Sequence, residues 1–482
     1  MIDLFILVPL AGLILLNLPF TGGLRRATWG FALAVALAEA GAVLLAPADW
    51  WTTPTPMDRF FAFALAAPDV SRVLLLSIGI VLFAALAVAR SMIADSRRRS
   101  NFASLLLVSL VGMNGAVLVT DLFSLYVFLE VASVASFVLI AFNRDSRALE
   151  GAFKYLILSA VATVLMVSAV ALLLMVAGGT SYDAVRAALE DSGDALVAKI
   201  AVGAFIAGLF IKGGLVPFHG WLPDAYSAAP APVSILLAGI VTKVMGIYAL
   251  VRLAGEVFVP AGPLGDVLML VGAVSIVVGA LAALVQTDLK RMLAYSSISQ
   301  VGYIVLGVGC FASAGPSEAA SLALVGAVFH LFNHAIFKSL LFVNSAAIEQ
   351  RLGTTDMNRM RGLGSRMPLT GTTSVIAALS TAGVPPLAGF WSKLIIVIAL
   401  WQAHDYGYAG LAVLMSVVTL AYMLVMQRRI FFGKVADEFA HVEEAGPGLV
   451  VPALVLAILV VAVGLLVPWV LETFMLPVAG LF

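Results

Sequence analysis

Apolar runs long enough to cross a lipid bilayer recur along almost the entire chain, and this feature limits the fold more than any other. A helix needs about 20 mostly apolar residues to span the hydrocarbon core of a membrane. Hydrophobic residues make up 62% of the 482 residues and charged residues only 11%, more apolar surface than a soluble domain of this length needs. The first run, "LFILVPLAGLILLNL", follows no basic leader, so we interpret it as a retained helix rather than a signal peptide. We therefore expect an all-α polytopic membrane protein.

Hydropathy predicts about 14 transmembrane helices joined by short connections, with no separate soluble domain. The longest connections, residues 47–70 and 178–197, are mildly acidic, and the second favours a small surface helix. The expected helices cover residues 2–19, 28–46, 71–90, 103–119, 121–142, 149–177, 198–220, 232–254, 264–286, 291–312, 318–347, 369–400, 408–432 and 449–473.

Basic residues predict the orientation, because loops on the inner side of a membrane carry an excess of Lys and Arg. Every strongly basic loop follows an odd-numbered helix, whereas the other loops are acidic or neutral. We therefore expect a multi-pass protein of the cell's inner (plasma) membrane with both termini on the outer side. The basic residues are Arg25, Arg26, Arg90, Arg97, Arg98, Arg99, Arg144, Arg147, Lys290, Arg291, Arg351, Arg359, Arg361, Arg366, Arg428, Arg429 and Lys434.

Two pairs of matching segments predict an internal repeat. "TDLFSLYVFLEVASV" from Thr120 resembles "TDLKRMLAYSSISQV" from Thr287, and "GLVPFHG" from Gly214 resembles "GVPPLAG" from Gly383 at a nearly equal separation. Each unit would hold five helices, an odd number that inverts the second copy, with helices 7 and 12 broken at Pro217 and Pro386. Short matches in apolar sequence also arise by chance. The expected divisions are 1–102 (helices 1–3), 103–254 (helices 4–8), 264–433 (helices 9–13) and 449–482 (helix 14).

Four ionisable residues lie deep inside predicted helices. They are Glu130 in helix 5, Lys212 in helix 7, Lys243 in helix 8 and Lys393 in helix 12. A charge at this depth costs several kcal/mol unless it is paired or hydrated, so such residues are functional candidates. The alternatives are structural ion pairs and lysines that extend to the interface. The depth of the first three residues argues against the second alternative.

The residue types suit proton transfer. Burial lowers the pKa of a lysine and a neighbouring carboxylate raises it, so a balanced lysine exchanges its proton where an arginine would not. Pro217 and Pro386 free backbone carbonyls, which bind water where they line a cavity. The pattern therefore predicts proton transfer along hydrated helix breaks.

Weaker candidates for a proton relay are His219, His330, His334 and Lys338, the last three at helical spacing in "HLFNHAIFK". Polar packing between helices explains them equally well. A metal site is not expected, because no carboxylate or cysteine shares that stretch. Cys310 is the only cysteine, which excludes an iron–sulfur cluster, and nucleotide-binding motifs are absent, so we expect no cofactor. A net charge of zero gives no support for a nucleic-acid partner.

Four segments resemble the antiporter-like proton-translocating membrane subunits of complex I (N, M and L types), Mrp-type cation/proton antiporters (D type) and membrane-bound hydrogenases. The segments are "KGGLVPFHGWLPDAYSAAPAPVS", "DLKRMLAYSSISQVGYI", "HLFNHAIFKSLLF" and "GVPPLAGFWSK", and the resemblance covers roughly residues 70–433. It implies fourteen helices with two inverted five-helix units. It also implies proton-translocating roles for Glu130, Lys212, Lys243 and Lys393. A lysine at the last position is similar to the N, L and D types and unlike the M type.

The resemblance implies a proton-translocating subunit of a respiratory complex similar to NADH–quinone oxidoreductase, or of a hydrogenase-type complex, without a catalytic centre of its own. The alternative is a subunit of a multisubunit Na⁺(cation)/H⁺ antiporter. A scaffold that has lost transport is disfavoured by the intact set of four ionisable residues. The expected partners are other membrane subunits, the lipid bilayer, and protons or Na⁺.

Overall fold

The computed structural model of the protein describes residues 1–18, 27–52, 64–192, 195–258 and 263–480. Within these ranges the chain is helical, and its extended contacts are isolated bridges rather than strands. The predicted basic loop with Arg25 and Arg26 lies outside the described residues.

The N-terminal part contains α1 (Leu4–Asn17), α2 (Thr28–Leu45), α3 (Ala48–Thr52) and α5 (Asp69–Met92). The next part contains α6 (Ser96–Leu118), α7 (Leu122–Ile140), η2 (Ala141–Asn143), α8 (Ser146–Ala177), α9 (Tyr182–Ser192), α10 (Leu196–Gly213), η3 (Phe218–Gly220), α11 (Trp221–Ala228), α12 (Ala231–Leu236), η4 (Leu237–Val241), η5 (Lys243–Tyr248) and α13 (Ala249–Glu256).

The C-terminal half contains α14 (Pro263–Leu284), α15 (Leu289–Ser313), α16 (Glu318–Leu352), η6 (Leu363–Ser365), α17 (Pro368–Ala382), α18 (Ala388–Gln402), α19 (Tyr406–Phe431), η7 (Asp437–Phe439), α20 (Pro447–Leu465), α21 (Val467–Val470), η8 (Leu471–Met475) and α22 (Leu476–Ala479). The segments η4, η5 and η8 are π-helical, with wider turns than an α-helix.

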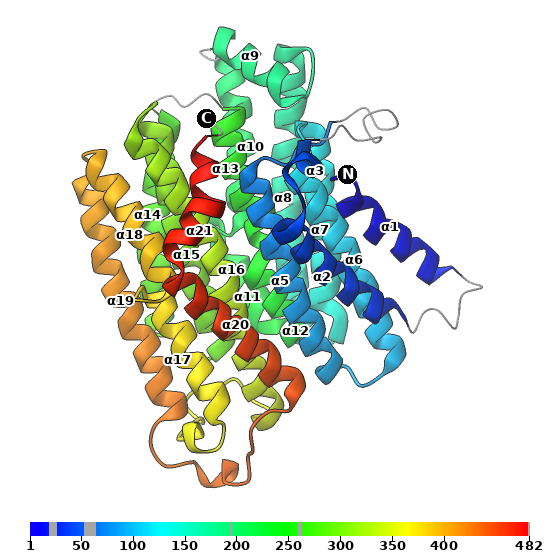
Figure 1. Cartoon of the computed structure of the whole chain (residues 1–482), viewed down its shortest axis with the longest axis vertical. Helices are drawn as coiled ribbons and strands as arrows, with labels where there is room; N and C mark the ends of the chain where they lie inside the picture. Colours follow the sequence, from blue (N-terminus) through cyan, green and yellow to red (C-terminus); the bar gives the residue numbers. More distant parts are fainter. Residues whose placement is uncertain (19–26, 53–63, 193–194, 259–262, 481–482) are drawn as a thin grey trace.

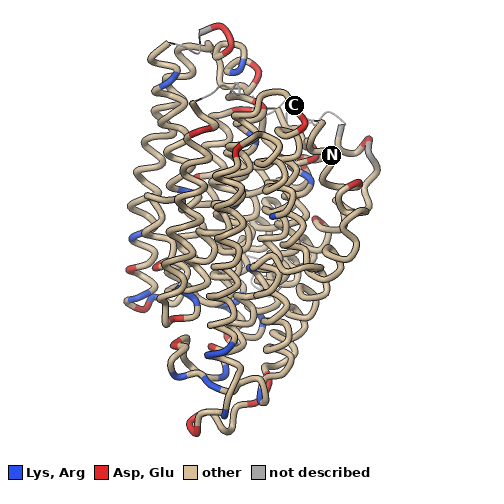
Figure 2. The backbone as a smooth tube through the Cα atoms, turned by 90° about the vertical axis from the view of Figure 1, so that its left-hand side faces the viewer, with Lys and Arg blue, Asp and Glu red and all other residues tan. Residues whose placement is uncertain are grey.

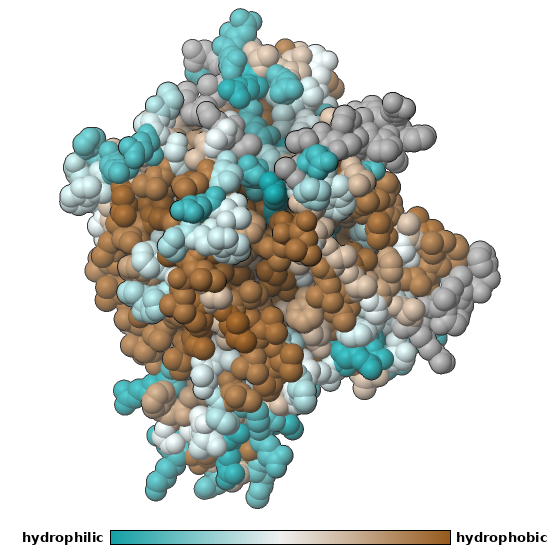
Figure 3. Space-filling model, in the orientation of Figure 1, coloured by the Kyte–Doolittle hydropathy of each residue, from teal (hydrophilic) through white to brown (hydrophobic). Residues whose placement is uncertain are grey.

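Most helices lie side by side along the long axis of the molecule (Figure 1). Within the described residues, twelve helices are long and apolar enough to cross a membrane, and three shorter apolar helices accompany them. Apolar side chains form a broad band between two polar ends on the face shown in Figure 3. The protein is therefore a multi-pass membrane protein, as predicted.

Burial distinguishes central from peripheral helices. The most apolar windows of α15, α16 and the α12–α13 segment are 94%, 89% and 100% buried, whereas those of α2 and α8 are 28% buried. The polar residues of α15 and α16 consequently face other helices, and the apolar residues of α2 and α8 face the bilayer.

Two helices break where the sequence predicts a break. The segment expected as one helix over residues 198–220 ends at Gly213, and the one expected over residues 369–400 is divided into α17 and α18. Gly214 and Gly383 follow the helix ends with φ of 67° and 85°, which glycine adopts without a steric penalty. Prolines follow each glycine and cannot donate the next helical hydrogen bond. Trp221 and Asp224 lie in α11, which follows the first break.

Lys and Arg gather mainly at the end of the molecule opposite the two termini (Figures 1 and 2). Contacts between helix ends support this grouping: Arg98 near the start of α6 donates to Asn143 in η2, and Arg429 near the end of α19 donates to the carbonyl of Gln286 after α14. We refer to this end of the bundle as the basic end.

Helix α10 meets η5 backbone to backbone. A Cβ atom added to Gly246 would lie 2.3 Å from Cα of Gly213 and 2.8 Å from the carbonyl oxygen of Leu209. Only glycine fits this approach, which fixes the backbone next to Lys212 against the segment that carries Lys243.

Candidate functional site

Lys212 and Glu130 form an ion pair between α10 and α7. The distance from Lys212 Nζ to Glu130 Oε1 is 2.8 Å. The lysine side chain is fully buried, whereas the glutamate side chain is 24% exposed. The two residues that the sequence singled out in separate helices are therefore direct partners.

Hydroxyl groups surround this pair. Lys212 Nζ donates to Ser133 Oγ at 2.9 Å and to Ser159 Oγ at 3.3 Å. Thr163 Oγ1 donates to Glu130 Oε1 at 2.8 Å. Hydroxyls both donate and accept, so they can hold the lysine in more than one charge state. These three residues were not predicted from the sequence, although Ser133 lies one turn from Glu130 and so on the same helix face.

Lys243 is buried at the start of the π-helical segment η5. Its ammonium group donates to the carbonyl oxygen of Ala238 and to Thr242 Oγ1, the latter at 3.1 Å. No carboxylate among the described residues forms an ion pair with it. The wide turns of η4 and η5 were not predicted, because no residue type marks them in advance.

Helix α16 contributes the next ionisable group, Lys338. Its Nζ donates to the carbonyl oxygen of Leu293 at 3.1 Å and to Ser296 Oγ at 2.7 Å on α15. Ser296 in turn shares a hydrogen bond of 3.0 Å with the hydroxyl of Tyr422 on α19. Lys338 was predicted as part of a relay, and it lies fully buried among these groups.

Lys393 lies on α18 and reaches back across the helix break. Its Nζ donates to the carbonyl oxygen of Thr381 on α17 at 2.9 Å and lies 4.4 Å from the centroid of the Tyr303 ring. Pro386 lies between Thr381 and Lys393 in the chain. The break thus exposes a carbonyl oxygen that the cation uses in place of a carboxylate.

His330 and His334 lie between these lysines on α16. His330 Nδ1 shares a hydrogen bond of 2.9 Å with Ser392 Oγ, directly before Lys393. Both ring nitrogens of His334 and Nε2 of His330 are buried with no partner among the described residues. Buried polar atoms are almost always hydrogen-bonded, so these nitrogens require water. His219, by contrast, lies half-buried on η3 near Tyr295, outside this row.

A second ion pair lies at the basic end. Lys290 Nζ is 2.8 Å from Glu349 Oε2 and also donates to the carbonyl oxygen of Ala229 at 3.1 Å. The lysine is buried, and both residues line a cleft of about 360 Å³ with the charged residues Asp145 and Arg147. Lys290 was interpreted from the sequence only as a basic residue of an inner-side loop, and its burial and its partner were not predicted.

Glu349 continues a polar stripe along α16. At 100° per residue, Glu349, Ser345, Lys338, His334 and His330 all lie within about one third of the helix circumference. Ser345 Oγ is buried without a partner among the described residues. The stripe leads from the cleft at the basic end to the centre of the bundle.

Other buried charges outside the predicted set have evident partners. Arg252 pairs with Glu256 at 2.9 Å and donates to the carbonyl oxygen of Val117 at 2.7 Å. Glu39 accepts a hydrogen bond of 3.0 Å from Asn114. At the surface, the exposed Lys154 pairs with Asp224 at 2.7 Å.

The fold and this row of groups define an integral membrane protein with ionisable side chains along its interior. The chain belongs to the family described as "NADH:quinone oxidoreductase/Mrp antiporter, TM", whose model matches residues 119–419. The predicted family membership is therefore confirmed.

Known relatives resemble almost the whole chain. The N-type subunit of NADH-quinone oxidoreductase from Desulforudis audaxviator is 34% identical, covering 96% of this chain and 94% of the relative. The D-type subunit of a Na(+)/H(+) antiporter from Alkalihalophilus pseudofirmus is 30% identical, covering 86% and 80%. A chain of the Mrp complex from Dietzia sp. DQ12-45-1b has the same fold, with a TM-score of 0.88 and 25% identity over 100% of this chain and 97% of that one.

Proposed function

We propose that the chain is a proton-translocating subunit of a multisubunit membrane complex. The observation that carries this proposal is the ion pair of Lys212 and Glu130 inside the membrane-spanning bundle, beside a row of further buried cations. Such groups are costly in a membrane and are retained where ions or protons pass. The relatives and the structural neighbour are subunits of oxidoreductases or antiporters, which supports a place beside other membrane subunits.

The residue chemistry gives each group a role. The carboxylate of Glu130 keeps Lys212 protonated until that carboxylate is neutralised or displaced. The lysine then transfers its proton to nearby hydroxyls and water. Lys243 and Lys338 transfer protons across the centre of the helix bundle through His334 and His330 and the water bound to them. Lys393 releases them at the break near Pro386. Each lysine rests on hydroxyl or carbonyl oxygens, which accommodate it with or without its extra proton.

Protons are taken up at the cleft of the basic end. Glu349 is one third exposed there, and Lys290 next to it is buried. From this pair the stripe of α16 leads through Ser345 to Lys338. A water molecule at Ser345 would satisfy its hydroxyl and connect the cleft to the interior.

Two inverted units position these groups. Asp121 and Asp288 each cap the following helix, and each accepts a hydrogen bond from a threonine, Thr180 or Thr355. The residue after each aspartate donates its N–H to the carbonyl of the same threonine. These matching contacts support the repeat. The twelve long helices, α1 and the broken pair α17–α18 then make up fourteen spans.

The orientation follows from the basic end, which the positive-inside rule places on the inner side of the plasma membrane. Both termini then lie on the outer side. Proton uptake at the cleft accordingly takes place from inside.

The second candidate function is cation/proton exchange, favoured by the similarity to the antiporter relative. Vesicles that contain the whole complex should be assayed for both proton pumping and sodium efflux, with Lys212→Ala and Glu130→Ala as variants. Loss of proton movement in both variants is expected. If both retain full transport in an assembled complex, the proposed path is wrong. Sodium efflux that is lost in the Lys212→Ala variant would favour cation/proton exchange as the function.

A further inference from the structure

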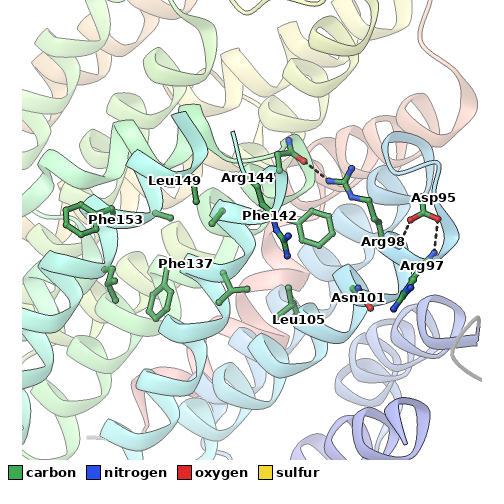
Figure 4. Close-up of a pocket in the computed structure, with 15 residues that line it drawn as sticks. Asp95, Arg97, Arg98, Asn101, Leu105, Phe137, Phe142, Arg144, Leu149 and Phe153 are labelled. Atoms are coloured by element: carbon green, nitrogen blue, oxygen red, sulfur yellow. Dashed lines mark hydrogen bonds between the residues drawn. The ribbon is translucent and has the colours of Figure 1, made fainter. Parts of the chain in front are cut away.

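A large groove lies at the basic end, outside the row of buried charges. Its volume is about 1070 Å³, and it is formed by the start of α6, the end of α7, η2 and the start of α8. Arg97, Arg98 and Arg144 stand at its rim (Figure 4). Its apolar lining comprises Leu105, Phe137, Val138, Ala141, Phe142, Leu149, Ala152, Phe153 and Leu156.

The rim carries an excess of positive charge. Among the described residues, none of the three arginines forms an ion pair. Arg98 donates only to the amide oxygen of Asn143, at 3.4 Å, and its guanidinium lies 5.4 Å from the centroid of the Phe142 ring. The one carboxylate of the groove, Asp95, accepts the backbone N–H groups of Arg97 and Arg98 as a helix cap. Its charge is thus partly engaged, and the three guanidinium groups have no carboxylate partner among the described residues.

The groove spans the boundary between water and the bilayer. The arginines lie at the ends of membrane-spanning helices, where chains leave the membrane. Phe153 and Leu156 lie two to three turns further along α8, and their side chains are 61% and 39% exposed. A molecule in the groove would therefore place one end among cations and the other along apolar side chains inside the membrane.

From this arrangement we propose that the groove binds an anionic phospholipid of the inner leaflet. Guanidinium groups bind phosphate oxygens in a planar, two-pronged geometry, which suits the lipid phosphate. The acyl chains lie along Phe137, Leu149 and Phe153. Basic pockets between helices at the inner face are suited to acidic headgroups, whose attraction to each nearby arginine is substantial.

Two other occupants are less consistent with the groove. A soluble phosphate would use the arginines but leave the apolar lining without a role. An apolar helix of a neighbouring subunit would cover the apolar lining but leave the three arginines at its edge without an anionic partner. Only an amphipathic anion satisfies both parts of the groove.

Lipid binding to the full-length chain can be measured by native mass spectrometry with phosphatidylglycerol and phosphatidylcholine of identical acyl chains. The wild type should bind phosphatidylglycerol more tightly. Each of Arg98→Gln and Arg144→Gln should weaken that binding about fivefold, and the double variant about 25-fold, without changing phosphatidylcholine binding. Arg428→Gln, which removes an exposed charge near the end of α19, should have no effect.

Three results would overturn the proposal. One is equal binding of the two lipids by the wild type. Another is competition by glycerol phosphate at the concentration of the lipid, which would indicate a phosphate site. The third comes from the assembled complex in its membrane: a photoreactive acyl chain should label α8 near Phe153, and an unlabelled groove occupied by another subunit would assign this surface to protein contacts.

Discussion

The ion pair of Lys212 and Glu130 yields the sharpest prediction. Glu130→Gln leaves a fully buried ammonium group without its carboxylate, although Ser133 and Ser159 still accept hydrogen bonds from it. Removing one partner of a buried pair costs about 3–5 kcal/mol. Lys212→Met leaves a carboxylate that is 24% exposed and still accepts a hydrogen bond from Thr163. This substitution should therefore cost about 3 kcal/mol or less, at or below the lower limit of that range. The double variant removes both charges and should be close to neutral.

Free energies of unfolding in mixed detergent micelles test these values through a double-mutant cycle. Because the two single costs add while the double variant is close to neutral, we expect a coupling energy of at least about 3 kcal/mol between the two positions. The exposed pair Arg186–Glu190, with side chains 51% and 52% exposed, is the control, and its coupling should stay below about 1 kcal/mol. All three variants of the buried pair should lose proton transport in vesicles that hold the whole complex.

A coupling energy no larger than that of the control would refute the reasoning from burial. Normal transport by the double variant would refute the role of the pair while leaving its structural part intact. The two measurements therefore separate stability from function.

Three further predictions concern other parts of the chain. Gly246→Ala should disrupt the contact with Gly213 and lower the yield of folded protein, whereas an unchanged melting temperature would contradict the close approach. Glu349→Gln should slow proton uptake from the basic end. Glu438→Gln, which removes an exposed carboxylate at the same end, should not slow it. Equal uptake rates in the two variants would contradict the proposed uptake route. Hydrogen bonds from Arg359 lower the pKa of Glu438 below its ordinary value of 4.5, so this contact contributes fully above pH 4.5 and is lost as the pH falls further. The hydrogen-exchange rate of residues 437–439, relative to the intrinsic rate at each pH, should rise in that acidic range, and an Arg359→Gln variant should lack the rise.

The sequence predicted those features that have a local cost. A lone charge in an apolar run and a proline after a glycine are both expensive inside a helix, and Lys212 and Pro386 stand out for this reason. Lys290 did not, because a lysine near a helix end is equally compatible with the membrane interface, and only the tertiary fold brings Glu349 to it. The serines around Lys212 were not predicted either, because a serine hydroxyl on a helix can donate its hydrogen bond to a backbone carbonyl of the same helix.

The glycine contact between α10 and η5 has a consequence for timescales. Lys212 directly precedes Gly213, and Lys243 lies less than one turn from Gly246, so backbone contact rather than side-chain packing sets their separation. A rotamer change of either lysine would leave this backbone contact intact. Helix movements take microseconds to milliseconds, the slower end of protein motion. The proton transfer that we propose between these two groups would therefore not require a helix to move.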